Sequence, residues 1–247
     1  MDLSLLINKA AEMDIKLSDV QADQFYKYYK LLVEWNEKIN LTAITVWEDV
    51  VVKHFIDSIS LINLFGDFSS FEKAMTGKTL IDVGTGAGFP GIPLKILFPG
   101  LSVTLADSLE KRVNFLNIVI SGLKLENIET IHGRAEDLAH TDNLREAFDY
   151  SVARAVASLP VLTEYCLPFV KEGGSFFAYK SEKAADEIKE AEHAISLLGG
   201  KMIKTVDFIL TGENLNRTII DIYKCGITPI KYPRKAGIIS KKPLKNN

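Results

Sequence analysis

A glycine-rich segment offers the clearest chemistry in this sequence. Residues 79–91 read TLIDVGTGAGFPG, an apolar run with one acid that breaks into closely spaced glycines, and a helix-like run follows at 92–97. Glycine lets a backbone adopt positive φ and pass close beneath a ligand. A strand, a tight loop and a helix N-terminus with free N–H groups form a site of nucleotide size. The segment therefore predicts a nucleotide-bearing cofactor.

Two cofactor motifs overlap in this loop. Residues 86–91 match the dinucleotide pattern G-x-G-x-x-G, whereas Gly84, Gly86 and Gly88 match the G-x-G-x-G of S-adenosylmethionine enzymes. Asp82 favours the second reading, because its carboxylate can accept hydrogen bonds from an ammonium group or from loop amides but would repel a pyrophosphate. The loop also lacks the lysine of an ATP-binding P-loop. We predict S-adenosylmethionine as the cofactor, with a dinucleotide as the alternative.

Further candidate residues follow the next two predicted strands. Asp107 ends the run at 102–107, where doubly wound folds place the acid that binds ribose hydroxyls. Ala135 and Glu136 follow the run at 128–132, the position from which methyltransferases contact adenine. The alternatives are a solvated aspartate and a helix-capping acid. Ligands bind at this edge of such sheets, so the agreement of several strand ends favours a cofactor site.

Two cations end the following strands. Arg154 follows the run at 147–153 and Lys180 ends the run at 174–180. Either could hold an RNA phosphate or a base edge, and either could be an ordinary exposed charge. His54, Asp57 and Ser58 suggest a hydrolase triad, but they share one predicted helix and lack a nucleophile elbow, so we reject that reading.

The N-terminal part reads as helical. Apolar residues recur at helical spacing over 3–13, and Ser18 with Gln21 forms a capping box before a second helix. Residues 36–42 lose the pattern and are expected to form a loop. Thr45 with Glu48 predicts another capped helix, and residues 66–77 are expected to be a linker. We therefore expect a helical region over 1–76, a cofactor-binding domain over 77–225 and a basic C-terminal arm over 226–247.

From residue 79 onward, short β-rich runs alternate with helical runs. Strands are predicted at 79–83, 102–107, 128–132, 147–153 and 174–180, with helices at 90–97, 109–122, 158–169 and 182–198. Such alternation predicts a parallel sheet with helices on both faces. The last runs, 202–210 and 217–224, are too close for a parallel crossover and should pair antiparallel. An α/β, doubly wound, mostly parallel seven-stranded sheet with an antiparallel edge hairpin is typical of class I methyltransferases.

Composition and charge narrow the class of protein. The net charge is −3, yet residues 222–247 contain seven Lys or Arg and no acid, so the tail is either a phosphate-binding arm or a solvated tail. Two cysteines, Cys166 and Cys225, predict reduced thiols in the cytoplasm. The sequence shows no charged leader before an apolar core and no membrane-length apolar run. We expect a monomer with no membrane partner.

Five blocks carry a resemblance to a known family. They read WNEKINLT at 35–42, HFIDS at 54–58, DVGTGAGFPG at 82–91, SVARA at 151–155 and YPRKAG at 232–237. In this order the set resembles ribosomal RNA small subunit methyltransferase G, also called glucose-inhibited division protein B. The resemblance runs from about residue 20 to the C-terminus.

The resemblance implies methyl transfer from S-adenosylmethionine to N7 of one guanosine in 16S rRNA, free or within the small subunit. It places Gly84, Phe89, Ala135, Glu136 and Arg154 at the cofactor, and Arg134 and Lys180 toward the RNA. Asp82, Gly86 and Asp107 complete the expected cofactor set. For RNA we add Asn40 in the loop at 36–42, and Arg234 and Lys235 in the basic arm. Guanine N7 carries a lone pair and no proton, so we expect no general base and no metal. A methyltransferase acting on a small molecule or protein, and a nicotinamide-dependent oxidoreductase, are the alternatives.

Overall fold

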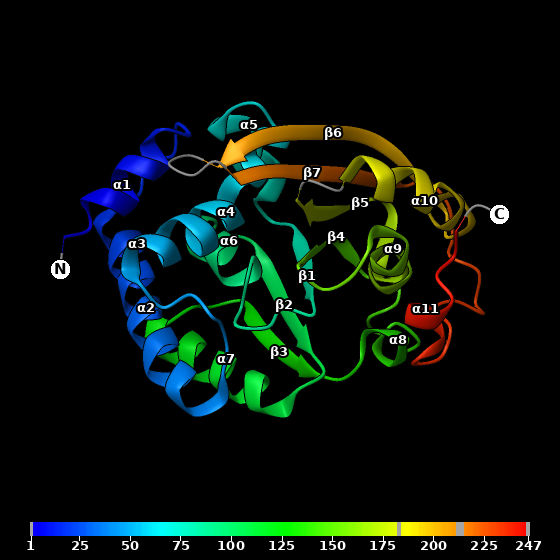
Figure 1. The fold of residues 1–247 in the computed structure, drawn as a ribbon, viewed down its shortest axis with the longest axis horizontal. Helices are drawn as coiled ribbons and strands as arrows, with labels where there is room; N and C mark the ends of the chain where they lie inside the picture. The colour runs from blue at the N-terminus through cyan, green and yellow to red at the C-terminus, as the bar shows by residue number, and fades with distance from the viewer. Residues whose placement is uncertain (1, 182–183, 211–214, 246–247) are drawn as a thin grey trace.

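The computed structural model describes residues 2–181, 184–210 and 215–245 (Figure 1). Nearly the first third of the chain is helical, up to the start of the sheet at Thr79. The elements are α1 (Ser4–Ala11), α2 (Asp19–Ile39), α3 (Trp47–Val50), the π-helix η1 (Val51–Ile56), α4 (Asp57–Ile59), the 3₁₀-helix η2 (Ser60–Leu64) and α5 (Phe68–Met75). The capping box predicted at Ser18 and Gln21 is present at the start of α2. No helix within the described ranges is long and apolar enough to cross a membrane.

Strands and helices then alternate as the sequence predicts. The strands are β1 (Thr79–Val83), β2 (Ser102–Asp107), β3 (Ile128–His132), β4 (Phe148–Arg154), β5 (Val170–Lys180), β6 (Gly200–Leu210) and β7 (Leu215–Lys224). The helices are α6 (Gly91–Leu97), α7 (Glu110–Leu123), α8 (Ala135–Leu138), α9 (Leu159–Cys166), the 3₁₀-helix η3 (Leu167–Phe169), α10 (Ala184–Leu197) and α11 (Ile238–Lys241). The first two residues of the helix predicted at 182–198, and most of the connection between the last two strands, lie outside the described residues.

Within the described residues the strands form one sheet in the order β3-β2-β1-β4-β5-β7-β6. Strands β1 to β5 pair in parallel, whereas β7 is antiparallel to both β5 and β6. The predicted fold class is confirmed. The strand order reverses between β1 and β4, and in such sheets ligands bind outside the carboxyl ends of the strands at that point.

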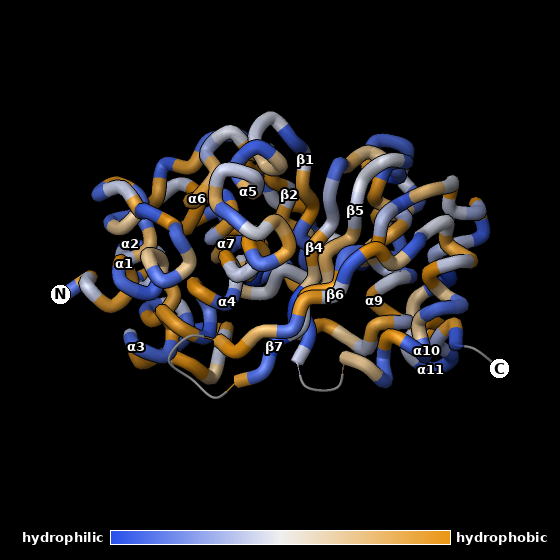
Figure 2. Tube along the Cα trace, turned by 90° about the horizontal axis from the view of Figure 1, so that it is seen from above, coloured by the Kyte–Doolittle hydropathy of each residue, from blue (hydrophilic) through white to orange (hydrophobic). Residues whose placement is uncertain are grey.

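Helices cover both faces of the sheet. The N-terminal helices with α6 and α7 lie on one side, and α8 to α11 lie on the other (Figure 1). Each side has its own apolar core. Apolar residues gather along the central strands, as a tube coloured by hydropathy shows (Figure 2). Strands buried on both faces need apolar residues at consecutive positions. The first core joins residues of α1 and α2 to β1 and β2, so the helical region packs directly on the sheet.

Three local predictions in the N-terminal part are wrong. Residues 36–39 are the last turn of α2, not a loop. Partly buried Trp35 and Ile39 pack against the core and extend the helix through a polar stretch. The expected linker at 66–77 contains α5, which Asp67 caps by accepting the Ser70 N–H. Thr45 caps nothing, because α3 begins at Trp47 with Val46 before it and no side-chain cap.

Candidate functional site

The glycine loop between β1 and α6 is held by the carboxylate of Asp82. Its Oδ2 accepts hydrogen bonds from Thr85 Oγ1 at 2.7 Å and from the Gly91 N–H at 2.8 Å. Asp82 is fully buried, and its other oxygen, Oδ1, has no hydrogen-bond partner among the described residues. Burial raises the pKa of Asp82 to about 7. Of the two roles that the sequence left open for this acid, binding loop amides is the one observed.

A cavity of about 280 Å³ lies at the carboxyl ends of β1, β2 and β3 and is called here the first cavity. Its wall includes four of the predicted cofactor residues: Gly84, Asp107, Ala135 and Glu136. Apolar side chains complete it, among them those of Val83, Ala106, Val156 and Val161. The first cavity therefore combines two carboxylates with an apolar lining, a composition that suits a nucleoside.

Asp107 is fixed within this wall by backbone donors. Its Oδ2 accepts the Gly86 N–H and its Oδ1 accepts the Leu109 N–H, both at 2.9 Å. Arg112 Nη1 lies 3.4 Å from Oδ2. Each oxygen of an ionised carboxylate has two lone pairs, so Asp107 keeps one acceptor position, on Oδ1, for a further hydroxyl group.

The other four predicted cofactor residues, Asp82, Gly86, Phe89 and Arg154, are not part of the first cavity's wall. Gly86 acts through its N–H on Asp107. Phe89 is buried, and its ring stacks on that of His54 with centroids 4.5 Å apart. The Arg154 guanidinium lies 5.2 Å from the same ring centroid. Phe89 thus joins the glycine loop to the helical region instead of facing the first cavity.

A second cavity, of about 300 Å³, opens at the carboxyl ends of β4 and β5. Cationic side chains dominate its wall and a single carboxylate lies among them. The residues are Lys53, His54, Asp57, Arg154, Ala155, Tyr179, Lys180, Ser181 and Arg217. A cavity with this charge suits an anionic or electron-rich ligand.

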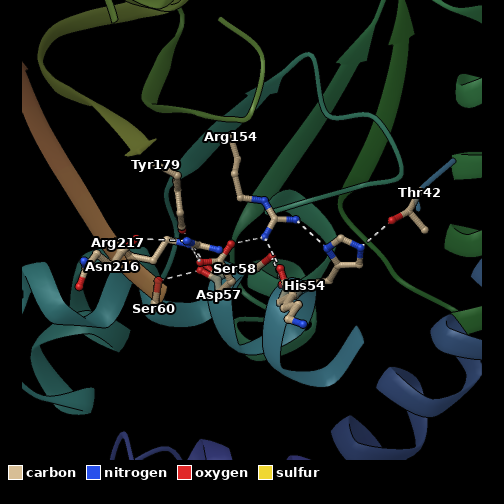
Figure 3. Close-up of polar contacts among 10 residues, drawn as sticks. Thr42, His54, Asp57, Ser58, Ser60, Arg154, Tyr179, Asn216 and Arg217 are labelled. Carbon is tan, nitrogen blue, oxygen red and sulfur yellow. Dashed lines mark hydrogen bonds and ion pairs between the residues drawn. The ribbon is translucent and has the colours of Figure 1, made fainter. Parts of the chain in front are cut away.

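Asp57 joins the two arginines of the second cavity (Figure 3). Its Oδ2 lies 2.6 Å from Arg154 Nη1, and its Oδ1 lies 2.9 Å from Arg217 Nε. Arg154 also donates to the Lys53 carbonyl at 3.2 Å. Asp57 is 4 % exposed. A carboxylate shared by two guanidinium groups at such depth fixes both in place and offsets one of their two charges, and its removal would leave buried charge without compensation.

His54 extends this network toward the loop after α2. Its Nδ1 lies 3.4 Å from Arg154 Nη2, and its Nε2 lies 2.9 Å from Thr42 Oγ1 (Figure 3). A guanidinium can only donate, so Nδ1 accepts and the ring proton resides on Nε2, which donates to Thr42. Burial, reinforced by the charge of Arg154, lowers the pKa of His54 to about 3. His54 is therefore neutral at physiological pH.

The titration of His54 predicts how stability depends on pH. The folded state keeps the imidazole neutral down to about pH 3, whereas an unfolded histidine takes up a proton near pH 6.5. The unfolded state therefore binds more protons between these values, and stability falls as pH falls through this window. A His54→Gln variant lacks this contribution. The parent therefore loses stability faster than the variant as the pH falls. The difference in unfolding free energy between parent and variant should decrease by up to about 1.4 kcal/mol per pH unit from pH 6.5 to 4.

Urea unfolding of the parent and of His54→Gln at several pH values measures this difference. The contributions of the other ionisable groups are common to both proteins and cancel in the difference. A difference that stays constant between pH 6.5 and 4 would contradict the neutral, buried imidazole.

The predicted RNA residues lie in separate places. Asn40 is exposed at the end of α2, where it adopts a left-handed φ of 50°. Arg134 belongs to the wall of the first cavity, with its guanidinium 3.8 Å from Glu136. Lys180 belongs to the second cavity, and its Nζ lies 2.6 Å from Glu187 and 2.9 Å from the Ala157 carbonyl.

The basic arm is folded onto the protein at Arg234. The guanidinium pairs with the fully buried Glu164, with Nε at 2.9 Å from Oε1 and Nη2 at 2.7 Å from Oε2. This pairing raises the pKa of Arg234 above its ordinary value. Lys235 is exposed. Of the two arm residues expected to bind RNA, only Lys235 is therefore presented to solvent without such an ion pair.

Sequence reasoning missed Asp57 and Arg217 as site residues. Asp57 belongs to the HFIDS block of the family resemblance, but the only role that the sequence suggested for it was in a hydrolase triad. The structure bears out the rejection of the triad, because the Ser58 hydroxyl donates to the His54 carbonyl and Asp57 pairs with arginines. No local signal marks Arg217, whose partner is 160 residues away. Across the ranges described, no cluster of three or more His, Cys, Asp or Glu could hold a metal ion.

Comparison with known proteins agrees with this geometry. A family model described as rRNA small subunit methyltransferase G matches residues 21–216. A protein of Lachnoclostridium phytofermentans named ribosomal RNA small subunit methyltransferase G is 50 % identical over 243 residues, covering 98 % of each chain. A protein of the same name from Acetivibrio thermocellus is 51 % identical over 240 residues, covering 97 % of this chain and 96 % of its own.

Solved structures share the fold at low identity. A mutant of MtNAS in complex with S-adenosylmethionine is 14 % identical and superposes with a TM-score of 0.54 over 91 % of this chain and 88 % of its own. TrmN from Thermus thermophilus is 17 % identical, with a TM-score of 0.51 over 68 % of this chain and 48 % of its own. These similarities support the α/β architecture.

Proposed function

This chain belongs to the rRNA small subunit methyltransferase G family, and on that premise we propose that it methylates N7 of one guanosine in the 16S rRNA of the small subunit, with S-adenosylmethionine as the methyl donor. One observation supports the proposal most directly: two cavities flank a single loop at the switch point of the sheet. Arg154 and Ala155 belong to the wall of the second cavity, and the next two residues, Val156 and Ala157, to that of the first. A cofactor in the first cavity and an acceptor base in the second could therefore meet across the loop that follows β4.

The residues of the first cavity fit S-adenosylmethionine. Asp107 keeps one lone pair, on Oδ1, for a ribose hydroxyl, and the buried Glu136 carboxylate offers acceptors to an adenine amino group. The apolar walls at Val83, Val156 and Val161 can enclose the purine. Asp82 Oδ1, which is buried and has no hydrogen-bond partner among the described residues, is a further acceptor beside the glycine loop. When bound, the cofactor supplies an electrophilic methyl group on a sulfonium.

The second cavity is proposed to hold the guanine and its phosphate. Its cations match the negative charge of RNA, and Arg154 and Arg217 carry donors for phosphate or base oxygens. Asp57 offsets one of the two arginine charges in advance, so the arginines oppose less strongly the positive charge that methylation leaves on the purine.

No residue needs to remove a proton in this reaction, because guanine N7 offers a lone pair. The work of the chain is to align the acceptor nitrogen with the methyl group and to hold it there. The relay from Thr42 through His54 to Arg154 fixes the arginine from one side, and Asp57 fixes it from the other (Figure 3). Phe89, stacked beneath His54, ties this alignment to the glycine loop.

The proposal is tested by methylation in vitro. Unmodified 30S subunits and deproteinised 16S rRNA are incubated with the protein and labelled S-adenosylmethionine, and the modified base is mapped by mass spectrometry. We expect one 7-methylguanosine per 16S rRNA. Calorimetry should show binding of S-adenosylmethionine and no binding of NAD. Label in protein or small molecules but not in RNA, or binding of NAD alone, would contradict the proposal.

The exposed lysines of the basic arm are proposed to contact RNA phosphates. Replacing Lys235, Lys241 and Lys242 together by alanine should weaken RNA binding and reduce the slope of log affinity against log salt, by about 0.7 for each lost contact to a single strand. A matched triple variant at Lys16, Lys73 and Lys201, which are exposed lysines outside the arm, serves as the control. Filter binding at several salt concentrations measures both slopes. Equal slopes for the two variants would exclude a phosphate role for the arm.

A further inference from the structure

The chain after β7 folds back over α8 and α9, and we call residues 226–242 the C-terminal strap. Four carbonyls of the strap accept hydrogen bonds from the body of the protein. Arg145 donates to the carbonyls of Thr228, Tyr232 and Pro229 at 2.8, 2.9 and 3.4 Å, and the His140 ring donates to that of Pro233 at 2.8 Å. The strap is thus docked by its backbone, not solvated.

The strap also buries part of its own surface. Tyr232 is buried in the second apolar core, and Ile239 of α11 is fully buried. Earlier in the strap, Thr228 donates its N–H to Glu146 and its hydroxyl to the Leu198 carbonyl. Buried apolar side chains with satisfied polar groups indicate a fixed position.

Arg234 is the strongest single attachment of the strap. Besides the three hydrogen bonds from its side chain to Glu164, its backbone N–H donates to Glu164 Oε1 at 2.8 Å, and its Nη2 donates to the Lys242 carbonyl at 2.8 Å. Glu164 is fully buried on α9. Its neighbours on that helix, Val161 and Tyr165, both belong to the wall of the first cavity.

The strap itself reaches the first cavity. Ser240, in α11, belongs to its wall together with Asp107 and Glu136. The Arg234–Glu164 pair therefore links two elements that contribute to the wall, α9 with Val161 and Tyr165 and the strap with Ser240. Displacement of the strap would remove Ser240 from the wall and would free α9 from its ion pair with Arg234.

We propose that the C-terminal strap is the outer wall of the S-adenosylmethionine site and that Arg234 is a positioning residue for cofactor binding, holding the strap on Glu164. This inference rests on the proposed function and adds a role for the YPRKAG block that differs from RNA binding. Without the Arg234–Glu164 pair, Ser240 and α9 are held less firmly in the wall. The cofactor then loses contacts with the strap and becomes more accessible to water there.

The test compares three variants by calorimetry with S-adenosylmethionine. Arg234→Gln should raise the dissociation constant about tenfold, since a neutral amide cannot pair with the Glu164 carboxylate. Ser240→Trp should raise it as much by filling the wall while leaving the ion pair intact. Lys231→Gln removes a charge from the same strap at an exposed position and should change it less than twofold.

Kinetics and RNA binding separate positioning from other roles. For Arg234→Gln, KM for the cofactor should rise with the dissociation constant while kcat at saturating cofactor stays within about twofold, and RNA affinity and its salt slope should be unchanged. Unchanged cofactor affinity in a folded Arg234→Gln protein, or a loss of RNA affinity in its place, would overturn the inference. If Arg234→Gln does not fold, normal cofactor binding by Ser240→Trp would overturn it. Failure of the parent protein to bind S-adenosylmethionine would instead refute the proposed function.

Discussion

Replacing Asp57 by asparagine is expected to lower the kcat/KM of RNA methylation by about a hundredfold, as misplacement of reacting groups by about 1 Å does. The carboxylate is the common partner of Arg154 and Arg217. Asparagine keeps the shape but not the charge, so the two guanidinium groups repel one another across the second cavity and move. The unfolding free energy should fall as well, by about 3 kcal/mol, because buried charge is left unpaired.

Two comparisons test this explanation. Asp49→Asn removes a carboxylate from the preceding helical turns, where it forms an exposed pair with Lys53, and should cost less than about 1 kcal/mol. The double variant Asp57→Asn with Arg217→Gln removes one of the two charges left without compensation, so it should be more stable than Asp57→Asn alone. Urea unfolding and single-turnover methylation measure both effects. If Asp49→Asn and Asp57→Asn behaved alike, the proposed role of Asp57 would be wrong.

The second large effect is expected at Gly88. Its φ of +102° lies outside the regions that alanine adopts, and an added Cβ would lie 2.5 Å from Ile92 Cδ1 and 2.6 Å from the Tyr28 hydroxyl. That hydroxyl donates to the Ala87 carbonyl and so ties α2 to the glycine loop. Gly88→Ala should therefore destabilise the protein by about 3 kcal/mol, from backbone strain and overpacking together, and should weaken S-adenosylmethionine binding.

Gly86→Ala is the matched control, because Gly86 also has positive φ, +63°, but nothing within 4 Å of an added Cβ. It should cost only the strain of the left-handed conformation, about 1 kcal/mol. In a Tyr28→Phe background, which lacks the hydroxyl, the additional cost of Gly88→Ala should decrease. Thermal unfolding and calorimetry measure these costs. Equal destabilisation at the two glycines would show that crowding by Tyr28 does not matter.

Local sequence patterns were sufficient for much of the architecture. The alternating β-rich and helical runs after residue 79, together with a short last connection, predicted the mixed sheet that is observed. Predictions failed where tertiary burial overrode composition. Residues 36–39 look polar yet complete α2, and α5 forms within an expected linker because Phe71 and Met75 bury their side chains completely.

The candidate site divides in the same way. Gly84, Asp107, Ala135 and Glu136 were predictable because parallel strands end at one edge of the sheet, so residues at strand ends meet whatever the intervening helices are. Phe89 and Arg154 were predicted to lie at the cofactor, but the sequence could not show that Arg154 lines the second cavity and that the Phe89 ring packs beside it, against a helical region folded over the sheet.

By itself the sequence determined the glycine loop, the alternation of strands and helices along the chain, and the family. Only the tertiary structure decided how the charges pair. Counting charges along the chain made residues 222–247 a basic arm, because no acid lies among them. Arg234 nevertheless has its partner 70 residues upstream, and Asp57 joins arginines 97 and 160 residues downstream. Local pattern encodes backbone geometry through short-range sterics and hydrogen bonds, whereas a buried ion pair exists only where folding brings distant segments together and excludes water.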